Sequence, residues 1–223
     1  MPTSSPHQIS DIVELIRAAD PQRVLDVGVG FGKYGVLVRE YLELLDGRAV
    51  YGDWRRTVDG IEIFPRYLTG LHETIYDRVI EGDAVEILPR IGDNDYDLVL
   101  LIDILEHFTR DVGWAVLEEC LRAGRNVIVG TPLGFFTQEG YDNPHEQHHS
   151  LWTRRDLETL GRPCLVLPEH HALVAFIGED AGRVQARVMS YRRRIQRSFG
   201  FLVRPLRAVK RLLPFTGARR LPS

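Results

Sequence analysis

Cysteine is scarce in this sequence and long apolar segments are absent, and both features narrow the class of protein. The 223 residues include two cysteines, Cys120 and Cys164. Their wide spacing matches neither a disulfide framework nor a CxxC metal motif. No stretch approaches the roughly 18 apolar residues that a membrane-spanning helix needs, and the first residues lack the apolar segment of a secretory signal. We therefore expect a soluble cytoplasmic protein with two reduced thiols.

Acidic residues are missing from the end of the chain. Residues 181–223 contain 12 Lys and Arg and no Asp or Glu, although the whole chain has a net charge of −3. We therefore expect a strongly acidic domain over residues 1–180 and a basic extension over residues 181–223. Within residues 199–215, apolar side chains recur at helical spacing and arginines fall on another face. This pattern predicts a basic amphipathic helix.

The basic helix has several plausible partners on sequence grounds alone. A helix of this type can lie on an anionic membrane, which would place the protein at the inner membrane surface. It can equally dock on the acidic domain or form a homo-oligomer. Nucleic acid is a less favoured partner, because the aromatic residues that stack on bases are sparse here.

Apolar runs alternate with helical patterns along most of the chain. We expect strands at 23–27, 58–63, 79–83, 96–102 and 126–129, followed by a β-hairpin formed by 164–167 and 172–177. We expect helices at 9–19, 33–45, 67–76, 85–88, 112–123 and 154–160. Such alternation predicts an α/β fold, with a mostly parallel sheet covered by helices on both faces. The closing hairpin adds an antiparallel strand.

A glycine-rich turn follows the first expected strand, in the sequence Asp-Val-Gly-Val-Gly-Phe-Gly at residues 26–32. Gly28, Gly30 and Gly32 allow positive φ angles and remove the Cβ atoms that would keep a ligand away from the backbone. Ligands of open α/β sheets bind outside the carboxyl ends of the strands. The turn therefore predicts a ligand site at this edge of the sheet.

The expected strands end in acidic residues, and this decides between two classes of nucleotide. Residues 30–35 also fit the GxGxxG pattern of dinucleotide-binding proteins, but a carboxylate at Asp26 would crowd a pyrophosphate. Asp26 suits a ligand with an amino group and no phosphate. Glu62 suits a ribose diol, and Asp83 suits the amino group of adenine.

These motifs resemble those of the class I S-adenosylmethionine (SAM)-dependent methyltransferases. The resemblance covers about residues 20–178 and includes the glycine motif, the acid that ends the second strand, Gly-Asp-Ala at 82–84 and an apolar strand that runs into Asp-x-x-Glu-His at 103–107. It implies a three-layer α/β/α sandwich around a seven-stranded, mostly parallel sheet with an antiparallel last strand. It also implies that SAM is bound by Asp26, Gly28, Gly30, Gly32, Glu62, Asp83, Ala84 and Asp103.

Two clusters of polar residues are candidates for the chemistry. The first is Asp103, Glu106 and His107, and the second is a loop at 143–154 that contains His148 and His149. In small-RNA 2′-O-methyltransferases and ubiquinone-pathway O-methyltransferases, which the pattern resembles, such residues bind a divalent metal. This resemblance implies a metal site formed by Asp103, Glu106, His107 and His148.

A metal-free reading of the same residues is equally open. His107, His148 or His149 can act as a general base, with Glu106 beside it. A purely structural role for the Glu-His pair is the third interpretation.

The loop that contains these histidines also resembles bacterial methyltransferases of surface-glycan pathways. We therefore predict O-methylation of a hydroxyl on a sugar, a glycolipid or another small molecule. Phe135, Phe136, Tyr141 and Trp152 would either form an aromatic floor for a sugar ring or pack in the core. Two alternative functions are an RNA ribose 2′-O-methyltransferase and a non-catalytic SAM-binding module that recruits a partner.

Overall fold

The computed structural model describes residues 6–45, 47, 50–134, 143–168 and 172–195. The chain forms two compact units, Met1–Gln185 and Ala186–Ser223. Of the second unit, residues 186–195 are described and are helical. The amphipathic pattern at 199–215 lies outside the described residues. Among the described helices, none combines the length and the apolarity that crossing a bilayer requires.

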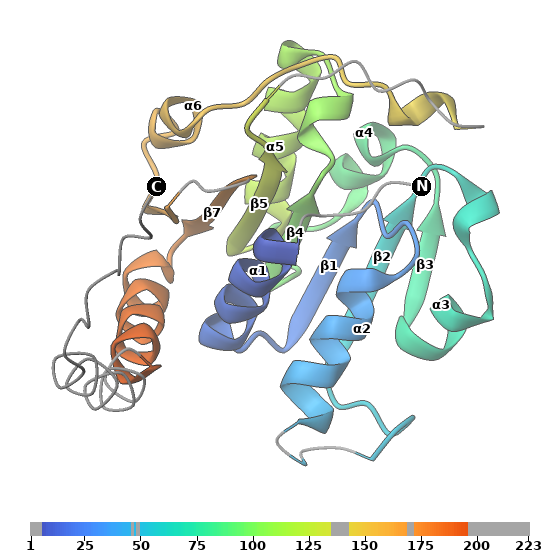
Figure 1. Cartoon of the computed structure of the whole chain (residues 1–223). Helices are drawn as coiled ribbons and strands as arrows, with labels where there is room; N and C mark the ends of the chain where they lie inside the picture. Colours follow the sequence, from blue (N-terminus) through green and yellow to red (C-terminus); the bar gives the residue numbers. More distant parts are fainter. Residues whose placement is uncertain (1–5, 46, 48–49, 135–142, 169–171, 196–223) are drawn as a thin grey trace, which may run out of the picture. The chain divides into compact units, whose positions relative to one another are not determined.

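A seven-stranded sheet forms the centre of the first unit (Figure 1). Its strands, in spatial order, are β3 (Arg78–Glu81), β2 (Thr57–Glu62), β1 (Arg23–Val27), β4 (Leu98–Ile102), β5 (Asn126–Pro132), β7 (Ala172–Gly178) and β6 (Cys164–Val166). Neighbouring strands from β3 to β5 are parallel, and β7 is antiparallel to both β5 and β6. The predicted mostly parallel sheet with its closing hairpin is confirmed.

Helices cover both faces of the sheet, which explains the continuous apolar runs of the central strands. In Figure 1, α1 (Pro6–Ala19), α2 (Lys33–Arg39) and α3 (Gly70–Ile75) lie on one face. On the other face, α4 (Ala84–Ile87), α5 (Arg110–Ala123) and α6 (Arg154–Glu158) pack into one apolar cluster with the sheet. All five residues of β4 are buried. The predicted three-layer α/β/α sandwich is confirmed.

Two predicted helices differ in their details. The helix expected at 33–45 changes after Arg39 into a π-helical turn, Glu40–Leu44, in which the amide of Leu45 bonds to the carbonyl of Glu40. Apolar spacing does not distinguish the two hydrogen-bonding patterns. The helix expected at 67–76 begins only at Gly70, because Leu68 is extended and the Thr69 side chain caps α3.

Candidate functional site

The turn between β1 and α2 has a backbone that favours glycine at each predicted position. Gly28, Gly30 and Gly32 have φ angles of 77°, 53° and 78°, which side chains rarely tolerate. A Cβ atom on Gly28 would also lie 2.1 Å from Cδ1 of Ile104, the second residue after β4. The turn therefore needs glycine at position 28 for both its conformation and its packing.

Hydrogen bonds from both sides hold this turn in place. The amide of Gly30 donates to Oε2 of Glu62 at 2.8 Å, and the amide of Phe64 donates to Oε1 of the same carboxylate at 2.8 Å. On the other side, His72 Nε2 lies 3.0 Å from the carbonyl oxygen of Gly30. Because His72 Nδ1 accepts the amide of Thr69 at 3.0 Å, the ring proton is on Nε2 and is donated to Gly30.

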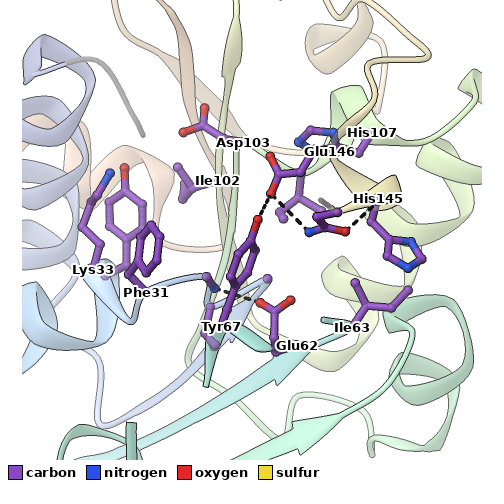
Figure 2. Close-up of a pocket in the computed structure, with 16 residues that line it drawn as sticks. Phe31, Lys33, Glu62, Ile63, Tyr67, Ile102, Asp103, His107, His145 and Glu146 are labelled. Atoms are coloured by element: carbon purple, nitrogen blue, oxygen red, sulfur yellow. Dashed lines mark hydrogen bonds between the residues drawn. The ribbon is translucent and has the colours of Figure 1, made fainter. Parts of the chain in front are cut away.

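A pocket opens above the turn at the carboxyl ends of β1, β2 and β4 (Figure 2). The short 3₁₀ helix η5 (Pro144–Glu146) and the residue before it complete the lining of this pocket. The side chains shown in Figure 2 that carry polar groups include Lys33, Glu62, Tyr67, Asp103, His107, His145 and Glu146. The predicted residues Gly28, Gly30, Glu62, Asp103 and His107 therefore share one pocket.

A second pocket adjoins the first one. The two pockets share Gly28, Ile63, Ile104, His107 and His145 in their linings. The second one also contains Asp83 and Ala84, at the end of β3 and the start of α4, together with Phe108 and His149. We call the two parts the Glu62 lobe and the Asp83 lobe. Together they form one groove along the edge of the sheet.

Asp26 is one of two predicted cofactor residues, together with Gly32, that are not in the described lining of either lobe. Asp26 is 2% exposed. Its carboxylate accepts the hydroxyl of Tyr76 at 2.6 Å, and burial raises its pKa to about 7. The Tyr76 hydroxyl also accepts the amide of Gly35 in α2 at 3.2 Å, so that Asp26 is joined to the start of α2 through Tyr76.

Asp103, the residue directly after β4, is held in a strained conformation. Its φ angle is 53°, which is uncommon for a residue other than glycine. The amide of Asp103 donates to the carbonyl of Gly130 at 2.8 Å, and Oδ1 accepts Nε2 of Gln8 at 2.9 Å. Its charge acts on Lys33 in the same lobe: partial burial lowers the Lys33 pKa, and Asp103 opposes that shift.

Three of the four predicted metal ligands come together. Glu106 and His107 lie in the 3₁₀ helix η4 (Leu105–His107), and each offers a ligand atom within 4.8 Å of one on His148. Asp103 is outside this group. Burial, followed by the Asp103 charge, raises the pKa of Glu106 to about 8. A carboxyl group that keeps its proton near neutral pH is a weak ligand until a cation displaces that proton.

A hydrogen bond from His107 fixes which of its ring nitrogens can act as a base. Its Nδ1 lies 3.1 Å from the carbonyl oxygen of Gln147, and since a carbonyl can only accept, Nδ1 carries the proton. The lone pair of the neutral ring is then on Nε2. The His148 ring packs 5.0 Å from the His107 ring, and burial followed by His107 lowers the His148 pKa.

Two of the three loop histidines are in the described lining of the lobes, and His148 is in neither lining. His145 lines both lobes and His149 lines the Asp83 lobe. The amide of His149 also donates to the Glu106 backbone carbonyl at 2.7 Å, and the Ser150 amide does so at 3.2 Å. These bonds attach the loop to the end of β4. Trp152 is 1% exposed and packs in the apolar core, whereas residues 135, 136 and 141 lie outside the described residues.

Several lining residues gave no signal in the sequence. Tyr67 stands in the middle of the Glu62 lobe (Figure 2) and donates its hydroxyl to Oε1 of Glu146 at 2.8 Å. Its ring lies 5.5 Å from Phe31 and 4.9 Å from Phe64. Tyr67 and Glu146 are 79 positions apart, so only the folded chain reveals the pair.

Comparisons with known proteins agree with this architecture. A family model described as "Methionine biosynthesis protein MetW" matches residues 7–139, which is more than half of the chain. The curated proteins contain no match.

Among solved structures, a SAM-dependent methyltransferase from Archaeoglobus fulgidus has a TM-score of 0.56 at 15% identity, covering 78% of this chain and 93% of that one. The N-terminal domain of EvdMO1, solved with S-adenosylhomocysteine (SAH) and D-fucose, has a TM-score of 0.56 at 17% identity, covering 78% and 84%. A 1,6-didemethyltoxoflavin-N1-methyltransferase from Burkholderia thailandensis, with SAH bound, has a TM-score of 0.51 at 16% identity, covering 79% and 91%. At these identities the likeness establishes the fold.

Proposed function

Because the chain belongs to the MetW family and is a SAM-dependent methyltransferase in family and fold, we propose that its two-lobed groove binds SAM and presents the methyl group to an acceptor hydroxyl. One observation carries this proposal: the order of the polar groups along the groove. Asp103 is followed by Glu62 in one lobe, and Asp83 lies in the other. This order corresponds to the amino group, the ribose and the adenine of one nucleoside.

The residues of the groove fit this cofactor chemically. Both oxygens of Glu62 already accept a backbone amide, and each still has a lone pair for a ribose hydroxyl. Asp83 caps α4 through one oxygen, which accepts the amide of Val85 at 2.9 Å, so its second oxygen is available to an adenine amino group. Gly28 lines both lobes, at the point where the ligand would cross from one to the other.

Bound SAM supplies an activated methyl group, and the chain must position the acceptor and remove its proton. We assign that proton to Nε2 of His107, since the hydrogen bond of Nδ1 to Gln147 fixes the basic nitrogen. A positioned base contributes typically 10²- to 10⁴-fold in rate. Glu106 supports the base from the same 3₁₀ turn, because its backbone carbonyl holds His149 and Ser150.

The acceptor that we propose is a hydroxyl of a sugar, a glycolipid or another small molecule. The aromatic rings of Phe31 and Tyr67, tilted by 48° to each other, border the Glu62 lobe. Each ring offers an apolar face of the kind that packs against a sugar ring. The EvdMO1 domain, which shares the fold, was solved with SAH and D-fucose. This reading also agrees with the glycan-type loop of the sequence.

A divalent metal is the second candidate for activating the acceptor. Glu106, His107 and His148 offer oxygen and nitrogen ligands within 4.8 Å of one another, a set that suits a hard or borderline ion. In that case the ion would lower the pKa of the acceptor hydroxyl in place of a base.

Calorimetry and methyl-transfer assays test the proposed function. We expect the purified protein to bind SAM and SAH, and to transfer a labelled methyl group from SAM to a member of a panel of sugars, nucleotide sugars and glycolipids. Absence of binding by both nucleosides would refute the cofactor site. Transfer to RNA alone would favour the ribose 2′-O-methyltransferase, and binding without transfer to any acceptor would favour a recruitment module.

A further inference from the structure

We propose that Lys33 and Asp103 bind the amino acid end of SAM as a pair of opposite charges, with Lys33 at the carboxylate and Asp103 at the ammonium group. This inference rests on the proposed function, because it takes the groove as the SAM site. It assigns a group of the ligand to each of the two charged side chains at this end of the Glu62 lobe.

The position of Lys33 supports this role. It is the first residue of α2, directly after Gly32, and its side chain lines the Glu62 lobe. Figure 2 shows Lys33 and Asp103 toward one end of the pocket, Glu62 near the middle and Ile63 with His145 at the other end. A nucleoside with its ribose at Glu62 and its base in the Asp83 lobe has its amino acid tail at the Lys33 end.

The charges of the lobe match those of the ligand. In the described lining, Lys33 is the only Lys or Arg, and it faces the carboxylates of Glu62, Asp103 and Glu146. SAM has two cationic groups, the sulfonium and the ammonium, and one carboxylate. A lobe with several acids and a single ammonium group is complementary to that pattern. Partial burial lowers the Lys33 pKa, and the same desolvation strengthens an ion pair with a carboxylate.

The residue type is also unusual for this chain. Only two of its 28 Lys and Arg residues are lysines, Lys33 and Lys210. A lysine has a slim stem and a compact ammonium group, whereas arginine carries a broad planar fork. Lys33 shares its wall with the aromatic rings of Phe31 and Tyr34, where the smaller head group leaves space for the ligand.

Hydrogen bonds within the protein already hold Asp103 in the conformation that we propose for binding the ammonium group. The bond from Gln8 and the bond of its own amide to Gly130 hold it at a φ of 53°. Such a conformation is uncommon for a residue other than glycine and persists only where the surroundings enforce it. The fold maintains this conformation at the point where the carboxylate enters the groove.

Four ligands that differ in one group each test the assignment. SAM and SAH carry the full amino acid, decarboxylated SAM lacks the carboxylate, and 5′-methylthioadenosine lacks the amino acid altogether. We expect Lys33→Met to weaken SAM and SAH binding roughly 10- to 100-fold, while its affinities for decarboxylated SAM and 5′-methylthioadenosine stay within about twofold. Lys33→Arg should restore part of the loss, because it keeps the charge.

Asp103→Asn is the matched variant for the ammonium group. It should weaken binding of SAM, SAH and decarboxylated SAM and leave 5′-methylthioadenosine unchanged. The inference is overturned if Lys33→Met weakens all four ligands equally or leaves SAH binding intact, as it would if Lys33 held an acceptor instead. Failure of wild-type protein to bind 5′-methylthioadenosine and SAH would refute the SAM site itself, which separates the two claims.

A measurement on the native side chain covers the case in which a variant misfolds. Reductive ¹³C-methylation of the full chain keeps the lysine charges and gives NMR signals from two lysines and the N-terminus, with Lys210→Arg assigning one of them. We expect SAH to shift the Lys33 methyl signal, and to change its pKa, more than 5′-methylthioadenosine does. Equal shifts with the two ligands would contradict the contact with the carboxylate.

Discussion

The carboxylate of Glu62 accepts the backbone amide of Gly30 at 2.8 Å, across 32 positions of the sequence. This bond joins the acid at the end of β2 to the middle of the glycine turn after β1. The two features that first indicated a nucleoside site are therefore parts of one structure. The carboxylate also orients the turn, so that changes at Glu62 act on the pocket as well as on a ribose.

Replacing Glu62 tests its role toward the ribose. Gln can still accept one of the two backbone amides, from Gly30 or Phe64, through its carbonyl oxygen, but its NH2 group then faces the other amide. It also loses the charge that strengthens hydrogen bonds from ribose hydroxyls. We expect Glu62→Gln to weaken SAH binding by roughly 10- to 100-fold, from about 1.5–3 kcal/mol for a charged hydrogen bond. Glu81→Gln is the control, because Glu81 pairs with Glu62 in register on β3 and is exposed. Equal affinities of the two variants in calorimetry would contradict the assignment.

Gly28 should tolerate no side chain. Gly28→Ala places a Cβ atom against Ile104 at a φ of 77°, and we expect a loss of stability of roughly 1–3 kcal/mol together with loss of SAH binding. The double variant with Ile104→Ala removes the clash and should recover part of the stability, while the strain of the backbone remains. Gly70→Ala, which meets no atom within 4 Å, is the control. Chemical denaturation checks all three, and an unaffected Gly28→Ala protein would be the contrary result.

His107→Gln separates catalysis from binding. If Nε2 of His107 takes the acceptor proton, kcat should fall by roughly 10²- to 10⁴-fold, with SAH affinity unchanged within about twofold. Wild-type protein treated with a chelator should keep its activity. Loss of activity on chelation, with recovery on addition of Mg²⁺ or Mn²⁺, would instead support the metal ligands Glu106, His107 and His148.

Asp26 should make stability decrease as pH rises. Burial raises its pKa in the folded state from 3.8 to about 7, so the folded protein binds more protons than the unfolded chain between these values. Stability from this group is therefore lost as pH rises through that window, by about 1.4 kcal/mol per pH unit at most, or roughly 3–5 °C in Tm. Asp26→Asn removes this titration and should give a shallower decline of Tm from pH 5 to 7. Parallel profiles of the two proteins would count against a buried, protonated Asp26.

The basic tail should bind anionic membranes. The spacing of apolar and basic residues at 199–215 predicts an amphipathic helix, and deletion of residues 199–223 should abolish sedimentation with phosphatidylglycerol vesicles. Binding should weaken in high salt, because part of it is electrostatic. The full chain with neutral phosphatidylcholine vesicles is the control. If the full chain fails to sediment with anionic vesicles, the membrane partner is excluded and the oligomer or docking alternatives remain.

The sequence alone determined the α/β class, the closing hairpin, and the group of glycines and acids at the strand ends. These follow from local patterns, since apolar runs become buried strands and parallel strands place their carboxyl ends at one edge. Folding decided what those patterns do not encode. It brought Asp26 to the hydroxyl of Tyr76, 50 positions away, and left Asp103 outside the group formed by Glu106, His107 and His148. It also brought Lys33 and the Tyr67–Glu146 pair into the groove. Such contacts join distant segments whose approach is set by the packing of the whole sheet and its helices.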